Sequence, residues 1–154
     1  MAITIYEPER AQAYGVGRIL DGDGHRVSFA FSVKYTCRGK LTGFLLYSYV
    51  DGNSVYLVTA FHITSFTTDG NHGYFEANCT LSKLNFKTHH CSREVYRVRV
   101  DVFDNKKNRE RDVFQIRIYN NLGLVKEEAG FDPVGHLLNG CIVVKHVKSH
   151  WKCC

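Results

Sequence analysis

The sequence predicts an all-β fold, either an antiparallel β-sandwich or a flattened β-barrel of about 7–9 strands. Apolar and polar residues alternate with a period of two along most of the chain, and polar turn residues separate the alternating segments. No segment carries the sustained apolar stripe of an amphipathic helix. The ten Phe and nine Tyr, set against two Pro, favour strands as well.

The expected strands follow one another with short turns between them. A first strand opens at "GVGRI" (15–19), and a last strand covers "GCIVVKHV" (140–147). Four segments have one apolar face and are expected to be half-buried strands: 26–35, 74–81, 94–103 and 113–118. Two more are apolar on both faces, which indicates central or covered strands: 41–50 and 54–66. The segment "LVKEEAGF" is expected to hold at most one or two helical turns.

Turn-forming residues mark the ends of these strands. They occupy 21–24, 38–40, 51–53, 69–73 and 120–123. The inward positions predict a core of Phe29, Phe31, Val33, Phe75, Val98, Val100, Phe114, Ile116 and Val144. We predict a single domain over residues 1–154, with a core at about 14–147 and a tail at 148–154.

Composition excludes several classes of function. The net charge of +5 is well below the clustered excess of a dedicated nucleic-acid binder, so nucleic acid is not an expected partner. No apolar run approaches the roughly 18 residues that span a bilayer, so no membrane span is expected. The N-terminal sequence has no visible signal peptide, which leaves a cytoplasmic location open.

The order of the segments carries a family resemblance. The segments are "GVGRI", "VSFAFSVKY", "GFLLYSYVDGNSVYLVT", "ITSFTTDGNHGYFEANCTL", "YRVRVDVFDNKKNRERDVFQIRIYN" and "LLNGCIVVKH". In this order they resemble the post-COAP domain, a β-rich module of secreted and often multidomain prokaryotic proteins. The resemblance implies an accessory module without catalytic residues, in an extracellular or cell-surface setting. The chain departs from that pattern in the insertion "SKLNFKTHHCSRE" and in the tail "KSHWKCC".

Three arginines are the strongest candidates for a binding site. Two registers pair the inward residues of 94–103 with the inward residues of 113–118. One places Arg99 opposite Arg117, and the other places Arg97 there. Like charges so placed repel each other by roughly 0.2–1 kcal/mol. Carboxylates can offset this by diagonal pairing, with Asp101, Glu94 and Glu110 as candidates. Alternatively, an anionic partner is held between the guanidinium groups.

The loop "DNKKNRER" (104–111) connects these two strands and contains four basic residues. Carboxylates are interleaved with the bases, which is unlike a dedicated phosphate site. We therefore predict a solvated hairpin end.

The cysteines leave alternatives open. All six are disulfide candidates: Cys37, Cys79, Cys91, Cys141, Cys153 and Cys154. Cys79 and Cys91 flank the insertion and can form a bridge if their Cα atoms lie within about 7 Å, but buried free thiols are an equal alternative. In the tail, His146, His150 and Cys153 are weak candidates for binding zinc or copper(I), against the alternative of a frayed terminus. No cofactor is predicted.

These observations favour a non-catalytic, extracellular-type β module for binding or structural assembly. Its expected partner is a protein or a polyanionic or carbohydrate surface, contacted through Arg97, Arg99 and Arg117, with Tyr74 and Tyr119 adding contact area. One alternative is a self-assembling homo-oligomer joined by edge strands or cysteines. Another is a metal- or small-ligand-binding protein that uses the His and Cys clusters.

Overall fold

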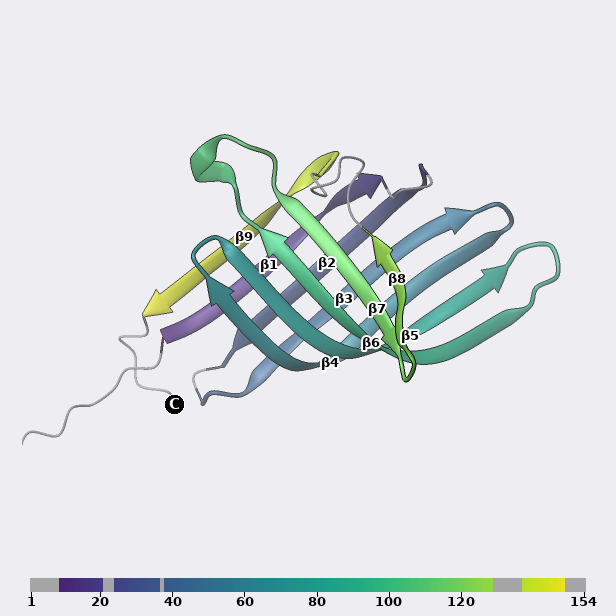
Figure 1. The fold of residues 1–154 in the computed structure, drawn as a ribbon, viewed down its shortest axis with the longest axis horizontal. Coiled ribbons are helices and arrows are strands. Elements are labelled where there is room, and N and C mark those ends of the chain that lie inside the picture. The colour runs from purple at the N-terminus through teal and green to yellow at the C-terminus, as the bar shows by residue number, and fades with distance from the viewer. Residues whose placement is uncertain (1–8, 21–23, 37, 129–136, 149–154) are drawn as a thin grey trace, which may run out of the picture.

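The computed structural model describes residues 9–20, 24–36, 38–128 and 137–148. Their strands form one antiparallel sheet of nine strands, which confirms the predicted all-β class (Figure 1). Consecutive strands are neighbours from β1 to β8, and the last strand pairs with the first. The strands are β1 (Glu9–Leu20), β2 (Arg26–Tyr35), β3 (Leu41–Asp51), β4 (Ser54–Asp69), β5 (His72–Asn85), β6 (Cys91–Phe103), β7 (Val113–Asn120), β8 (Gly123–Glu128) and β9 (Asn139–Lys148).

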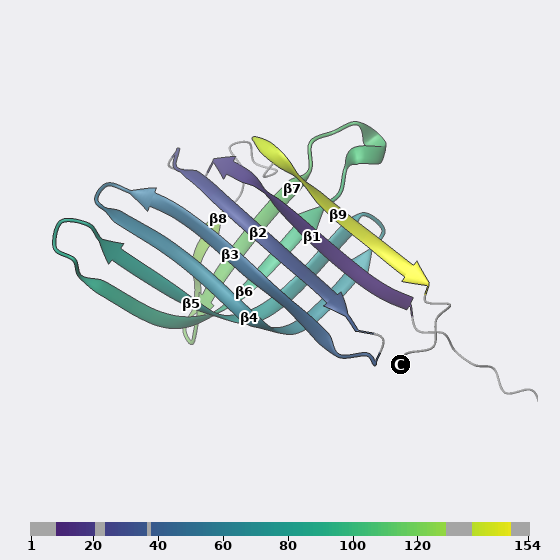
Figure 2. The same cartoon turned by 180° about the vertical axis from the view of Figure 1, so that it is seen from behind.

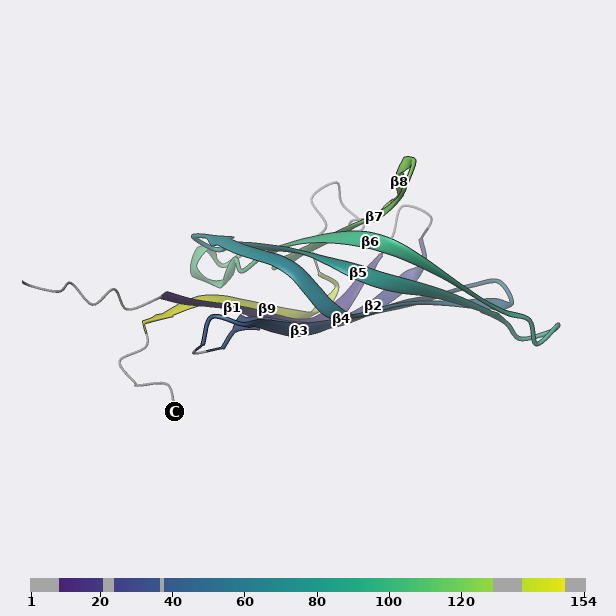
Figure 3. The same cartoon turned by 90° about the horizontal axis from the view of Figure 1, so that it is seen from below.

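The sheet curls so that its two halves face each other, but it does not close. Figure 3 shows β9, β1, β2 and β3 in one layer and β5, β6 and β7 in the other, with β4 passing between them. The register of β4 with β5 shifts between Thr59 and His62 and again between Ile63 and Ser65. Such irregularities bend a strand and increase its local twist. They lie where β4 changes layers.

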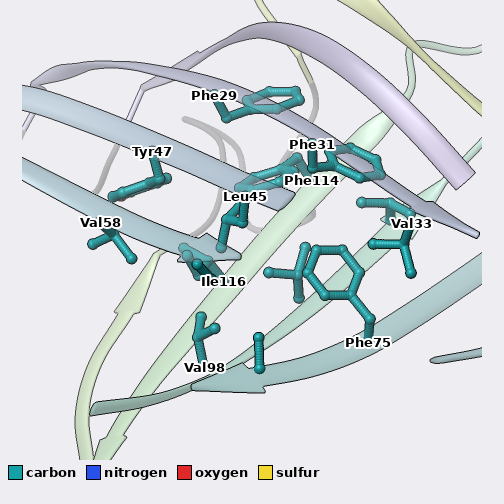
Figure 4. Close-up of a cluster of buried hydrophobic side chains, with 14 of the residues drawn as sticks. Phe29, Phe31, Val33, Leu45, Tyr47, Val58, Phe75, Val98, Phe114 and Ile116 are labelled. Carbon is teal, nitrogen blue, oxygen red and sulfur yellow. The ribbon is translucent and has the colours of Figure 1, made fainter. Parts of the chain in front are cut away.

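The core fills the space between the two layers (Figure 4). The rings of Phe29 and Phe114 stack across it with centroids 4.0 Å apart, and those of Phe31 and Phe75 lie 5.7 Å apart. All the predicted core residues are buried except Val144, which is partly buried against the same cluster. Alternation therefore identified the inward faces correctly, because it depends only on which face of each strand meets the core.

The outer edge of β9 is covered by side chains from the β6–β7 loop. Asp112 Oδ2 accepts a hydrogen bond from the Ile142 backbone N–H at 2.7 Å, and Asp104 Oδ2 accepts one from the Val144 N–H at 3.2 Å. Lys106 Nζ lies 3.2 Å from Asp112 Oδ2 and 3.4 Å from Asp104 Oδ1, and it also donates to the Ile142 carbonyl. We call Asp104, Lys106 and Asp112 the β9 latch. The latch gives hydrogen-bond partners to backbone N–H and C=O groups that would otherwise have none at the edge of the sheet.

The predicted hairpin end therefore has a structural role. Burial lowers the pKa of Lys106, but the hydrogen bond and charge of Asp112, together with Asp104, raise it overall, so the lysine stays protonated. Arg111 Nη1 adds a hydrogen bond to the Leu137 carbonyl at 3.4 Å. Lys107 is exposed. The carboxylates among the bases bind a neighbouring strand of the same chain.

The structure decides two points that the sequence left open. The segment from Leu124 to Glu128, expected to hold at most one or two helical turns, belongs to strand β8. Of the two alternatives for Cys79 and Cys91, both thiols are free and no disulfide joins them. β5 and β6 keep pairing through the insertion until Cys91 lies opposite Leu84, five residues along β5 from Cys79. At about 3.4 Å per residue this separation far exceeds the reach of a disulfide, and an odd spacing turns the two side chains to opposite faces.

The other cysteine and histidine candidates do not form a cluster in the described residues. Cys141 is a free, exposed thiol on β9. Cys37, His150, Cys153 and Cys154 lie outside the described residues, and of His146 only the backbone position, opposite Ala11, is described. Within the described ranges, no group of three or more His, Cys, Asp or Glu side chains is arranged to hold a metal ion. No helix in these ranges is long and apolar enough to cross a membrane.

Candidate functional site

The three predicted arginines lie on the outer face of β6 and β7, on the side of the molecule seen in Figure 1. The observed register pairs Arg99 with Arg117 and Arg97 with Tyr119, which is the first of the two registers allowed by the sequence. The inward residues of both strands are buried, so the arginines face away from the core. The structure thus brings together three of the side chains named from the sequence.

Asp101 offsets the repulsion between the two opposed arginines. Arg99 Nε donates to Asp101 Oδ2 at 3.1 Å, and Arg117 Nη1 lies 3.9 Å from the same oxygen. Asp101 is only 7% exposed, so these contacts are shielded from solvent. The hydrogen bond to Asp101 raises the pKa of Arg99. Of the three carboxylates considered, the diagonal partner is Asp101.

A histidine and aromatic rings complete this cluster. His72 Nε2 lies 2.9 Å from Asp101 Oδ1, and its ring stacks on Phe103 with centroids 4.3 Å apart. The Arg99 guanidinium lies over the Tyr74 ring, 4.7 Å from its centroid, in a cation–π contact. Arg99 is therefore held on two sides. Nothing in the sequence distinguishes His72, because "DGNHG" has the composition of a turn although its histidine begins β5.

Arg97 has a different environment. Its side chain is exposed and makes no hydrogen bond or ion pair with any residue in the described part of the chain. Beside it lies an open hollow of about 450 Å³ in the outer face. Six outward side chains from four strands line the hollow: Thr64, Glu76, Asn78, Arg97, Arg99 and Tyr119. Arg117 is not among them.

The hollow continues towards the β7–β8 turn. A second depression of about 260 Å³ shares Asn78, Arg97 and Tyr119 with the first. The register of β7 with β8 shifts between Ile118 and Tyr119, and Figure 3 shows β8 standing away from the sheet at this side. Tyr119 therefore lies at the register shift between β7 and β8. The pairing of β5 with β6 places Glu76 and Asn78 beside the arginines, and Thr64 reaches the same hollow from β4. Alternation alone did not identify these three residues.

The charges of the hollow set a limit on what it can bind. The formal charges of Arg97 and Arg99 are balanced by those of Glu76 and Asp101, and Asp101 is hydrogen-bonded to Arg99. The Arg97 guanidinium keeps its hydrogen-bond donors free within the described residues, with amide and hydroxyl groups beside it. This balance matches a single carboxylate or sulfate group better than a polyanion, which requires several unpaired cations.

Comparison of the chain with family models, curated proteins and solved structures found no match. The resemblance to the post-COAP domain therefore stays a prediction.

Proposed function

We propose that the chain is a non-catalytic β module that binds a ligand through one carboxylate or sulfate group at the Arg97 hollow. The observation that carries the proposal is the exposed guanidinium of Arg97, unpaired in the described part of the chain and set beside a hollow with Asn78 and Tyr119. A planar guanidinium binds a carboxylate or sulfate bidentately. The Tyr119 ring offers an amphipathic surface next to that contact.

The neighbouring contacts support this proposal. Arg99 is fixed by Asp101 and Tyr74, so one wall of the hollow keeps its shape when a ligand enters. Glu76 disfavours densely charged polymers, because a second anionic group near it is repelled. We infer an acidic sugar or an acidic peptide as the ligand class. The post-COAP resemblance supports an extracellular or cell-surface setting for such binding.

The self-assembly alternative receives less support. The β9 latch already occupies the N–H groups of Ile142 and Val144, so a second copy cannot add a strand there without displacing Asp112 and Asp104. Cys91 and Cys141 are exposed free thiols, and Cys153 and Cys154 lie outside the described residues, so a cysteine link between subunits stays an alternative.

An NMR titration tests the proposal. Trigalacturonate and a short aspartate-containing peptide are added separately to the ¹⁵N-labelled protein, with neutral maltotriose as the control ligand. We expect amide shifts at Asn78, Arg97 and Tyr119 with at least one acidic ligand and none with maltotriose. The two acidic arms distinguish a sugar from a peptide as the source of the carboxylate.

Matched arginine variants complete the test. Arg97→Gln removes the unpaired guanidinium and should weaken binding by roughly 10- to 100-fold, the equivalent of one charge-assisted hydrogen bond. Arg93→Gln removes the same charge from an exposed position four residues away on the same strand and should leave binding unchanged. Equal losses in both variants, or shifts confined to other surfaces, would show that the hollow is not the site. Failure of both acidic ligands to bind would refute the proposal.

A further inference from the structure

A second surface lies on the other side of the molecule, on the outer face of β9, β1, β2, β3 and the first half of β4 (Figure 2). We call it the β9–β4 face. Large apolar side chains are exposed on it, among them Val16 on β1 at 59% exposure and Phe61 at the irregularity of β4 at 74% exposure. The exposed apolar residues are Tyr14, Val16, Phe44, Leu46, Val50, Leu57 and Phe61.

The register places these side chains side by side. Val16 lies opposite Ala30, and Ala30 lies opposite Leu46, which gives one apolar row across three strands. Tyr14 lies opposite Ser32, and Ser32 lies opposite Phe44, which gives a parallel row. Neighbouring strands are about 4.8 Å apart, and the two rows are two residues, about 7 Å, apart along each strand, so their side chains adjoin. Contiguous apolar patches on a sheet face mark sites of association.

The charges at the described outward positions of this face have one sign. None of the described outward positions of the face holds Asp or Glu. These positions are every second residue of 12–20 on β1, 26–34 on β2, 42–50 on β3, 55–61 on β4 and 139–145 on β9. Cations stand at both ends of the apolar rows. Arg18 and Arg26 lie at one end, and Lys34 and Lys145 lie at the other. Lys145 Nζ lies 5.5 Å from the centroid of the Tyr14 ring, so apolar and cationic groups adjoin.

We propose that the β9–β4 face docks on an anionic lipid surface. Its apolar side chains enter the boundary between headgroups and acyl chains, while the lysines and arginines contact phosphate and carboxylate groups of the headgroups. A second copy of this face is a poor partner, since its cations would meet cations. The proposal concerns a different surface from the Arg97 hollow and does not depend on it.

The spread of the apolar side chains supports a lipid surface over an acidic protein. Figure 3 shows the strands of this layer edge-on as a gently curved layer. Its aromatic side chains Tyr14, Phe44 and Phe61 are spread over three strands. Interfacial aromatic rings and flexible lysine stems occupy the same level of a bilayer. Protein interfaces instead concentrate their binding energy in a few residues around a central pocket.

Co-sedimentation with lipid vesicles tests this inference. We expect the full chain to pellet with phosphatidylcholine vesicles that contain about one-third phosphatidylserine, and to stay in the supernatant with phosphatidylcholine alone. Added salt should release the protein, because it screens the headgroup charge. No pelleting with the anionic vesicles would overturn the proposal and leave the face to a protein partner.

Single variants then locate the contact. Lys34→Gln and Arg26→Gln should each weaken binding roughly fivefold, the factor equivalent to the ~1 kcal/mol expected per cation near an anionic membrane. Phe61→Ser should weaken it as well, and its exposed position leaves folding unaffected. Arg93→Gln is the matched control on the outer face of β6 and should bind as the native chain does. Equal losses for Arg93→Gln and Lys34→Gln would overturn the assignment, as would a dimer in sedimentation equilibrium that Phe61→Ser dissociates.

Discussion

Asp112→Ala should destabilise the protein strongly, although it lies in a loop. The Asp112 side chain accepts hydrogen bonds from the Ile142 N–H at 2.7 Å and the Asn105 N–H at 2.9 Å, and it also pairs with Lys106. Asp112 is 6% exposed and Ile142 is fully buried, so water cannot readily replace the carboxylate. The substitution leaves two backbone donors without their acceptor and opens the edge of β9.

The magnitude follows from the number of donors that lose their partner. A buried donor left unpaired costs about 1–3 kcal/mol, and the Asn105 N–H is only partly shielded, so its share is at the lower end. Lys106 keeps Asp104 and the Ile142 carbonyl as partners and adds little to the loss. We expect the free energy of unfolding to fall by about 2–5 kcal/mol for Asp112→Ala. Asp112→Asn keeps one carbonyl acceptor and should lose about 1–2 kcal/mol.

Urea unfolding followed by fluorescence measures this loss, and hydrogen exchange of the Ile142 amide shows where it arises. Glu110→Ala removes an exposed carboxylate from the same loop and should change stability by no more than about 0.5 kcal/mol. If Asp112→Ala is as stable as Glu110→Ala and the Ile142 amide stays protected, Asp112 does not hold the edge of β9.

Three further predictions concern buried groups. Tyr47→Phe should leave stability unchanged or raise it by about 1 kcal/mol, because the buried Tyr47 hydroxyl has no partner within the described residues; calorimetry that shows a loss would contradict this. Burial raises the pKa of the Cys79 thiol to about 11, so Ellman's reagent at pH 8 should label Cys91 while Cys79 reacts only on unfolding. The pKa of Cys79 is higher in the folded chain than the unfolded value of 9.0. The stabilisation that the folded chain gains from the neutral thiol is therefore complete below pH 9.0 and is lost as the pH rises to about 11. Asp101→Asn should lower the free energy of unfolding in urea by about 1–3 kcal/mol, because Arg99 loses its buried partner. Adding Arg117→Gln should restore part of that loss, because it relieves the repulsion between Arg99 and Arg117. A double variant no more stable than Asp101→Asn would contradict the described role of Asp101.

The sequence determined the faces of the strands. In β2, β6 and β7 the period of two separates Phe29, Val100 and Ile116, which meet the core, from the arginines, which do not. Parity also limited the pairing of β6 with β7 to two registers, and Asp101 was among the expected partners of the opposed arginines. These features depend on local alternation, because a shift by one residue turns every side chain of a strand to the other face.

Long-range features had no local signal. The pairing of β9 with β1 joins segments more than a hundred residues apart, and the bend in β4 follows from register shifts that only the pairing with β5 defines. The separation of Cys79 from Cys91 depends on how far the β5–β6 hairpin extends. The carboxylates of the β6–β7 loop were visible in the sequence, but their bonds to Ile142 and Val144 arise because the curled sheet brings β9 beside that loop. Alternation along a strand thus sets which side chains face inward, while the curvature of the whole sheet decides which of the outward ones meet to form a latch, a hollow or a docking face.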